Sequence, residues 1–379
     1  MTMKDAIISQ LTTGNEEISP RALELILMRH LGPVINDAHF RIGFSNLGRG
    51  HFISVLPRAS TLSYEITPNG FRNVETGLYL ESVEGHEINE IMRLHANAQG
   101  ELFYRPVLQG DRLFGQVIFT YENGEDIPRQ FQLFREPQRT FTPPLPTLEF
   151  REGIPIITVR VMGADGHEDA FFYEHAVAFL SFAELVRDEP AVIVDVRSNS
   201  GGNSLLPTRW FYALTGEIVP SNLTQLGTGG ADGRELENMM ESHPLQEGYA
   251  EYFANFRQLD ENHSISFDFP RRIVYREQII IVLTDRATVS AGEAFTDLTT
   301  NMSNALIIGS PTSGTLAFSG RADVKLLPNS GLNFAFGRGK LLWDDNHFAE
   351  NIGIQPDIWT DGIALDVALG LLRGVGFMD

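Results

Sequence analysis

The sequence predicts an α/β protein, and three features lead to this class. From about residue 150, short apolar runs alternate with segments patterned as helices. Residues 191–196, Ala-Val-Ile-Val-Asp-Val, are nearly all apolar, as is typical of strands inside a parallel sheet. Residues 278–283 repeat this pattern. The expected strands are 156–161, 191–196, 278–283 and 305–308, and the expected helices are 173–187, 205–214 and 291–302.

Each core helix is predicted from its own pattern. The segment 173–187 is apolar on nearly every side, which predicts a helix buried on both faces. The two later helices each follow an apolar strand through a short loop of small and polar residues. Strand, loop and helix therefore repeat, as parallel sheets require.

The part of the chain before this core predicts two further regions. Residues 1–45 form an N-terminal helical segment, with Ser19 as the capping hydroxyl and Pro20 at the first helical position. Residues 46–137 read as a β-rich module of short strands, interrupted by one helix at 87–96. A proline-rich linker at 143–146 leads into the core, 138–379, which carries a polar insertion at 216–270.

Composition excludes several classes of function. The 379 residues contain no cysteine, so disulfides, thiolate metal sites and a cysteine nucleophile are absent. A formal net charge of −20 argues against nucleic-acid binding, and no apolar run is long enough to span a membrane. The N-terminus shows no signal peptide, so we expect a cytoplasmic protein. Lysine occurs only as Lys4, Lys325 and Lys340.

Two strand-to-helix junctions carry residues that suit catalysis. After residues 191–196 comes Arg197-Ser-Asn-Ser-Gly201-Gly202, whose glycines leave backbone N–H groups uncovered at the ligand-binding edge of the sheet. The same glycines could equally serve a tight turn. At the second junction Ser290 begins a helix, where a hydroxyl could act as a nucleophile, but Ser290 and Glu293 also have the spacing of a capping box.

Taken together, the two junctions resemble those of the tail-specific, or C-terminal processing, serine proteases. Asp-Val-Arg-Ser-Asn-Ser-Gly-Gly is similar to the oxyanion loop of that family, and Ala-Thr-Val-Ser-Ala-Gly-Glu to its nucleophile motif. Residues 309–314 look like its Gly-x-x-Thr-x-Gly stretch, and residues 353–357 like its Gly-Val-x-Pro-Asp motif. The resemblance implies a ββα-superhelix (crotonase- or Clp-like) core with an N-terminal helical cap. Residues 77–91 more weakly resemble part of a PDZ domain.

One departure from the family concerns the general base. In its lysine-dependent branch a lysine follows the Gly of Gly-x-x-Thr-x-Gly, whereas here Thr315 follows Gly314. Another base is then needed, and histidine is the commonest choice. His39 resembles the histidine of the tricorn-type branch, in which a Glu assists; Glu350 would be that Glu. On other readings, His39 packs a helix junction and Glu350 is an ordinary surface carboxylate.

The resemblance therefore implies a serine peptidase with a Ser290, His39 and Glu350 catalytic set. Gly201 or Gly202 and Ala291 would form the oxyanion hole. Peptides or unfolded protein ends would be the substrates, no cofactor or metal is expected, and a homo-oligomer is left open. An acyl-transfer or cyclase reaction would use the same serine.

A second class of function is a non-catalytic protein that binds peptides or hydrophobic ligands on a degenerate protease scaffold. The missing lysine and the 26 phenylalanines are the observations that favour it.

Overall fold

A computed structural model describes most of the chain, as two compact units. Unit 1 comprises Met1–Ile53, Asn222–Pro270 and Gly314–Asn351, and unit 2 comprises Ser54–Ser221, Arg271–Ser313 and Ile352–Asp379. The described residues are 3–12, 19–31, 35, 40–43, 49–50, 56–110, 116–133, 144–163, 170–221, 223–227, 257–259, 265–267, 272–316, 318–319, 323–327, 329–337, 339–343, 350–360 and 363–377.

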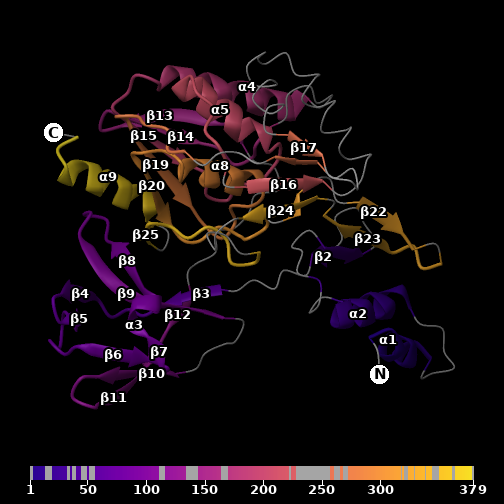
Figure 1. Ribbon diagram of the computed structural model, residues 1–379, viewed down its shortest axis with the longest axis horizontal. Helices are drawn as coiled ribbons and strands as arrows, with labels where there is room; N and C mark the ends of the chain where they lie inside the picture. Colours follow the sequence, from indigo (N-terminus) through magenta and orange to yellow (C-terminus); the bar gives the residue numbers. More distant parts are fainter. Residues whose placement is uncertain are drawn as a thin grey trace. The chain divides into compact units, whose positions relative to one another are not determined.

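Unit 2 is built on a mixed sheet with a parallel centre (Figure 1). Its main path runs β12-β3-β9-β8-β25-β20-β19-β15-β14-β13, and β4 and β5 attach to β9. Neighbours from β14 to β8 along this path are parallel, and the flanking pairs are antiparallel. The strands are β3 (Leu56–Ala59), β4 (Tyr64–Thr67), β5 (Gly70–Asn73), β8 (Met92–Ala96), β9 (Leu102–Gly110), β12 (Gln132–Leu133), β13 (Thr147–Arg151), β14 (Ile154–Thr158), β15 (Ala191–Asp195), β19 (Ile279–Thr284), β20 (Ala305–Gly309) and β25 (Ile358–Trp359).

Helices cover both faces of the parallel strands, which explains why β15 is buried along its whole length. Val192 and Val194 pack with α4 (Ala170–Leu185), α5 (Leu205–Thr215) and α8 (Ala291–Thr299). Ala191 and Ile193 point to the opposite face and pack with α9 (Ala364–Gly374). The α/β class predicted from the apolar runs is confirmed.

Four aromatic rings fill the space between α4, α5 and α8. Phe179, Trp210, Phe211 and Phe295 are all fully buried, and the Phe211 and Phe295 ring centroids are 4.9 Å apart. Phe295 contacts the other three rings, so it ties α8 to both neighbouring helices.

The prediction that 173–187 is buried on both faces is wrong. α4 buries Ala176, Phe179 and Ala183, but Tyr173 and Val177 are about half exposed on its other side. The helix has more apolar residues than its one packed face can bury. The outer residues lie at the surface because the structure places no described element over them.

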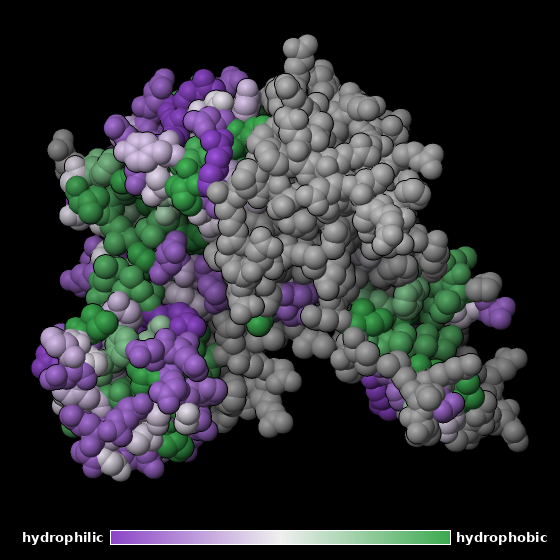
Figure 2. All heavy atoms as spheres, in the orientation of Figure 1, coloured by the Kyte–Doolittle hydropathy of each residue, from purple (hydrophilic) through white to green (hydrophobic). Residues whose placement is uncertain are grey.

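The β-rich part of unit 2 has its own core around Tyr64, Val83, Val117 and Phe119. A second sheet runs β11-β10-β6-β7, formed by β6 (Leu80–Val83), β7 (His86–Glu87), β10 (Gln116–Tyr121) and β11 (Asp126–Gln130). The space-filling view shows this part, at lower left, with a largely hydrophilic surface (Figure 2).

The predicted helix at 87–96 is wrong over most of its length. Only Ile88–Ile91 forms a single turn, α3, and Met92–Ala96 is strand β8. β8 pairs along its length with β9 and meets β25 at His95. Pairing on both sides outweighs the local helical pattern of this segment.

Unit 1 contains short helices and small sheets. Ser19 caps α2 through the Ala22 N–H, at 3.2 Å, as its position before Pro20 predicts. The sheets follow the orders β2-β1-β23-β22, β16-β24-β21 and β17-β18. The elements are α1 (Met3–Thr12), α2 (Pro20–Leu31), β1 (Arg41–Gly43), β2 (Arg49–Gly50), β16 (Leu223–Gly227), β17 (Arg257–Leu259), β18 (Ile265–Phe267), β21 (Phe318–Ser319), β22 (Asp323–Leu326), β23 (Asn333–Phe336) and β24 (Gly339–Trp343).

No helix within the described ranges is both long and apolar enough to cross a bilayer.

Replacing Phe295 by alanine tests the aromatic cluster. Phe295→Ala should lower the free energy of unfolding by about 3–5 kcal/mol, because it removes a buried ring and leaves a cavity. Urea denaturation followed by circular dichroism measures the change. Phe150→Ala is the matched control, since the Phe150 side chain is 58% exposed, and it should change stability far less. Equal losses in the two variants would contradict this account of the core.

Candidate active site

The register of two parallel strands brings the two junctions together. Asp195, the last residue of β15, pairs with Leu283 near the end of β19. The loops that follow therefore leave the same edge of the sheet, where ligands bind in open α/β folds. The Val289 N–H donates to the Asn199 carbonyl at 2.9 Å, so the loops are in direct contact.

Gly201 lies directly against Ser290. A Cβ added at Gly201 would be 3.0 Å from the Ser290 Cβ and 3.6 Å from its Oγ. The backbone of Gly201 has a φ of 86°, which favours glycine, and its N–H donates to Asn199 Oδ1 at 2.9 Å. Both the close approach and the backbone conformation therefore require glycine here.

Gly202 is required for a different reason. Its φ is 135°, and an added Cβ would be 1.7 Å from the Met162 carbonyl oxygen. That contact would force the backbone of the loop to move. Among the described residues, no hydrogen bond from the Gly202 N–H is found.

Ser290 has an unusual backbone at the start of α8. Its φ of 50° and ψ of −114° are rare for a residue with a side chain, and strain of this kind is characteristic of functional sites. Ser290 and Glu293 form the capping box that their spacing predicts, and the Ser290 N–H donates to Glu293 Oε2 at 2.9 Å. Ala291 is the first residue of the helix, so its N–H has no acceptor within the helix.

The loop that follows β20 binds the other oxygen of the Glu293 carboxylate, Oε1. The Thr312 hydroxyl donates to Glu293 Oε1 at 2.7 Å and accepts the Ile354 N–H at 2.8 Å. Gly353 is pressed against this loop, because an added Cβ would be 2.2 Å from the Thr312 carbonyl oxygen. The segments 309–313 and 352–357 thus pack beside the start of α8.

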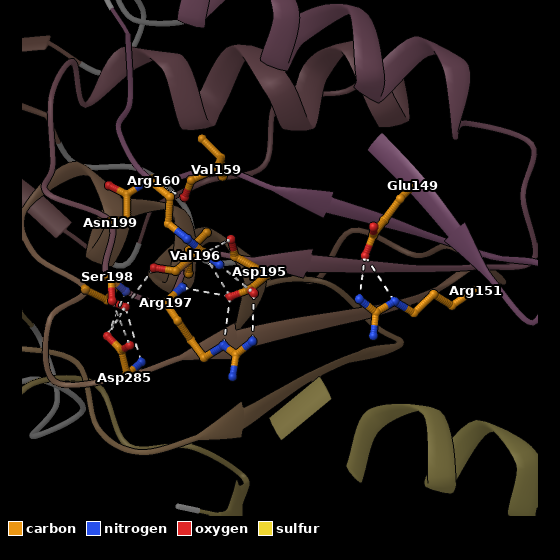
Figure 3. A network of polar contacts seen from close by, with 11 residues as sticks. Glu149, Arg151, Val159, Arg160, Asp195, Val196, Arg197, Ser198, Asn199 and Asp285 are labelled. Atoms are coloured by element: carbon orange, nitrogen blue, oxygen red, sulfur yellow. Dashed lines mark hydrogen bonds and ion pairs between the residues drawn. The ribbon is translucent and has the colours of Figure 1, made fainter. Parts of the chain in front are cut away.

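Asp195 and two arginines form an ion-pair cluster at the base of the first loop (Figure 3). Arg160 and Arg197 each reach Asp195 Oδ2 at 2.8 Å. Burial alone would raise the pKa of Asp195, but hydrogen bonds from Arg197 and Arg160 lower the pKa to about 2. The carboxylate therefore stays ionised and anchors both side chains.

Asp285 is a second buried carboxylate, directly after β19. Its Oδ1 accepts hydrogen bonds from both the Ser198 N–H and the Ala287 N–H, each at 2.9 Å. Burial raises the pKa of Asp285 despite these donors. Asp285 and Asn199 were not singled out from the sequence, because polar residues in such loops are common turn formers.

The predicted site residues fall in different parts of the chain. Ser290, Ala291, Gly201 and Gly202 all lie in unit 2, whereas Glu350 lies in unit 1. His39 lies outside the described residues.

Thr315, which follows Gly314 at the position of the lysine in the lysine-dependent branch, is buried. Lys325 and Lys340 lie in strands β22 and β24. In the part of the chain that the structure describes, no group of three or more acidic or histidine side chains could hold a metal ion.

The model of peptidase family S41 matches residues 167–360, which include both loops and Ser290. The chain belongs to peptidase family S41. No curated protein matches the sequence significantly. The expectation of a tail-specific or C-terminal processing serine protease family is confirmed at the level of the family.

Several solved structures are similar to this family S41 chain. Mature CPAF complexed with lactacystin is 15% identical, with 98% of this chain and 90% of that chain covered and a TM-score of 0.49. A putative peptidase from Parabacteroides merdae is 12% identical, with coverages of 100% and 89% and a TM-score of 0.44. The photosystem II D1 C-terminal processing protease is 13% identical, with coverages of 94% and 86% and a TM-score of 0.37. All three TM-scores are below 0.5, so the family membership rests on the family model.

Lowering the pH tests the Asp195 cluster. The pKa of Asp195 falls from 3.8 to about 2 on folding, so the ionised carboxylate in its arginine cluster contributes, net of the cost of its burial, roughly 2 kcal/mol of stability above pH 4. That contribution should be lost as the pH falls from about 4 to 2. Asp195→Asn should be less stable at pH 7 and lack this component of the acid transition in urea denaturation measured at each pH. Glu149→Gln, at a half-exposed ion pair, is the control and should leave the transition unchanged. An identical acid transition in Asp195→Asn would refute the assignment.

Proposed function

We propose that the chain is an active serine peptidase in which Ser290 is the nucleophile, His39 the general base and Glu350 the group that orients His39. The observation that carries this proposal is that Ser290 has a strained backbone and packs against Gly201 of the first loop. A serine held on a strained turn between a strand and a helix projects its hydroxyl towards a bound substrate. Membership of family S41 supports peptides as substrates.

Two backbone N–H groups would form the oxyanion hole. The Gly201 N–H already donates to Asn199 Oδ1, which favours Gly202 of the two glycines. The Ala291 N–H, at the first position of α8, would supply the second donor, and the N-terminal end of the helix favours negative charge there.

The base is proposed from chemistry and sequence. Family members that use lysine have it after the Gly of Gly-x-x-Thr-x-Gly, and Thr315 stands there in this chain. An imidazole titrates near neutral pH, so His39 could accept the Ser290 proton and return it to the leaving group. A carboxylate such as Glu350 would hold the ring in the correct tautomer.

The proposed reaction proceeds in two steps, acylation of Ser290 and hydrolysis of the acyl-enzyme. Ser290 Oγ attacks the peptide carbonyl carbon while its proton passes to His39. The C–N bond then breaks, the amine takes that proton and leaves, and the acyl group stays on Ser290. Water then attacks the ester with His39 as base, which releases the new carboxylate and restores the serine.

Substitution of Ser290 and of His39 tests this mechanism. Ser290→Ala and His39→Ala should each lower kcat by about 10⁴-fold or more, as removal of a nucleophile or its base does in other serine peptidases. Cleavage of a quenched fluorescent peptide library measures the activity. His30→Ala, a histidine in the last turn of α2, is the matched control and should retain wild-type activity. If both alanine variants cleave as fast as wild type, the mechanism is wrong.

A non-catalytic binding protein is the second candidate. The capping box gives Ser290 a structural role that needs no chemistry, which is the observation in its favour. A fluorophosphonate probe separates the two functions, because it reacts only with an activated serine. Labelling that is lost in Ser290→Ala would exclude a purely binding role, and absence of labelling in wild type would exclude the peptidase.

A further inference from the structure

Asp285 joins the two loops that carry the proposed oxyanion hole and nucleophile. Its Oδ1 accepts the N–H of Ser198, from the first loop, and the N–H of Ala287, from the second. The Ser198 hydroxyl donates to Oδ2 at 3.3 Å, and the Thr288 hydroxyl lies 3.3 Å from Oδ1. Figure 3 shows the Asp285 carboxylate facing Ser198 across the gap between the loops.

The residue that Asp285 holds has a backbone that would otherwise relax. Ser198 has a φ of 58°, an uncommon conformation for a residue other than glycine. Two hydrogen bonds from Ser198 to one buried carboxylate offset the cost of that conformation. Without the carboxylate, the Ser198 N–H would lose its acceptor and the loop would be free to move.

The effect extends from Ser198 to the proposed oxyanion donors. Asn199 follows Ser198, and its backbone carbonyl accepts the Val289 N–H. Its side chain accepts the Gly201 N–H and donates to the Val159 carbonyl at 3.0 Å. Gly202 comes next in this tightly bonded loop, so its N–H direction depends on where Ser198 is held.

We infer that Asp285 is a positioning residue that fixes the oxyanion loop at its working distance from Ser290. This inference rests on the proposed peptidase function. Asp285 acts by accepting backbone hydrogen bonds from both loops, and it does not touch the reacting atoms. A misplacement of about 1 Å at a reacting centre can cost 10²-fold in rate, so loss of this carboxylate should act mainly on kcat.

Two substitutions at Asp285 separate hydrogen bonding from charge. Asp285→Ala removes every acceptor and should lower kcat by about 10²-fold, with KM within about threefold of wild type. Asp285→Asn keeps an oxygen for the two N–H groups and should stay within about tenfold of wild type. Asp126→Ala is the matched control, because Asp126 also accepts a hydroxyl, from Thr120, but lies exposed in β11, and its kcat should not change.

The experiment measures kcat and KM on one peptide cleaved by wild type, together with the rate of fluorophosphonate labelling. The inference would be overturned if Asp285→Ala had the kcat of wild type. It would also be overturned if kcat fell as far in Asp285→Asn as in Asp285→Ala. If Asp285→Ala does not fold, Asp285→Ser decides, because the shorter serine side chain cannot reach the N–H groups of both loops. Its kcat should fall by about tenfold or more, and an unchanged kcat overturns the inference. A wild-type protein that neither cleaves nor labels would instead refute the proposed function itself.

Discussion

The parallel pairing of β15 with β19 is the constraint on which the rest of the site depends. Because Asp195 pairs with Leu283, both strands end at the same edge and their loops must pack against each other. This register places Gly201 against Ser290. Burial of both faces of β15 fixes the register, because a shift by one residue would exchange the side chains that face α5 for those that face α9.

Much of the core could be predicted from the sequence because its strands are short and almost entirely apolar. Residues 191–194 are all apolar and only Asp195, at the end of the strand, is charged, so the interior of a parallel sheet suits this segment. Residues 87–96 could not be predicted in the same way. Met92–Ala96 becomes a strand through pairing with β9, which follows it in the sequence, and with β25, at Ile358–Trp359. The pairing with β25 arises only in the folded chain, so the local pattern of residues 92–96 does not show it.

The candidate site could also be predicted only in part. The motifs at 195–203 and 284–293 are local in sequence, and their order identifies two loops that the sheet then brings together. The use of each donor within those loops is not local. The Gly201 N–H is taken by Asn199 Oδ1, and Ser198 is held by a carboxylate 87 residues further along the chain. Such pairings arise from tertiary packing and leave no periodic signal in the sequence.

Three buried carboxylates at one edge of a sheet are costly unless each is satisfied, and each is satisfied by its own set of donors. The negative charge of Asp195 is balanced by two guanidinium groups, which keep the carboxylate ionised. Asp285 is held by backbone N–H groups of both loops. Glu293 accepts the Ser290 N–H and the Thr312 hydroxyl.

Glu293 holds the backbone of Ser290 itself, whereas Asp195 and Asp285 hold the loops beside it. The strained φ and ψ of Ser290 would relax in a less constrained loop. A site held in this way needs little rearrangement when charge develops on a substrate, because its donors are already fixed in direction. The conformational stability of unit 2 therefore sustains the strain at Ser290.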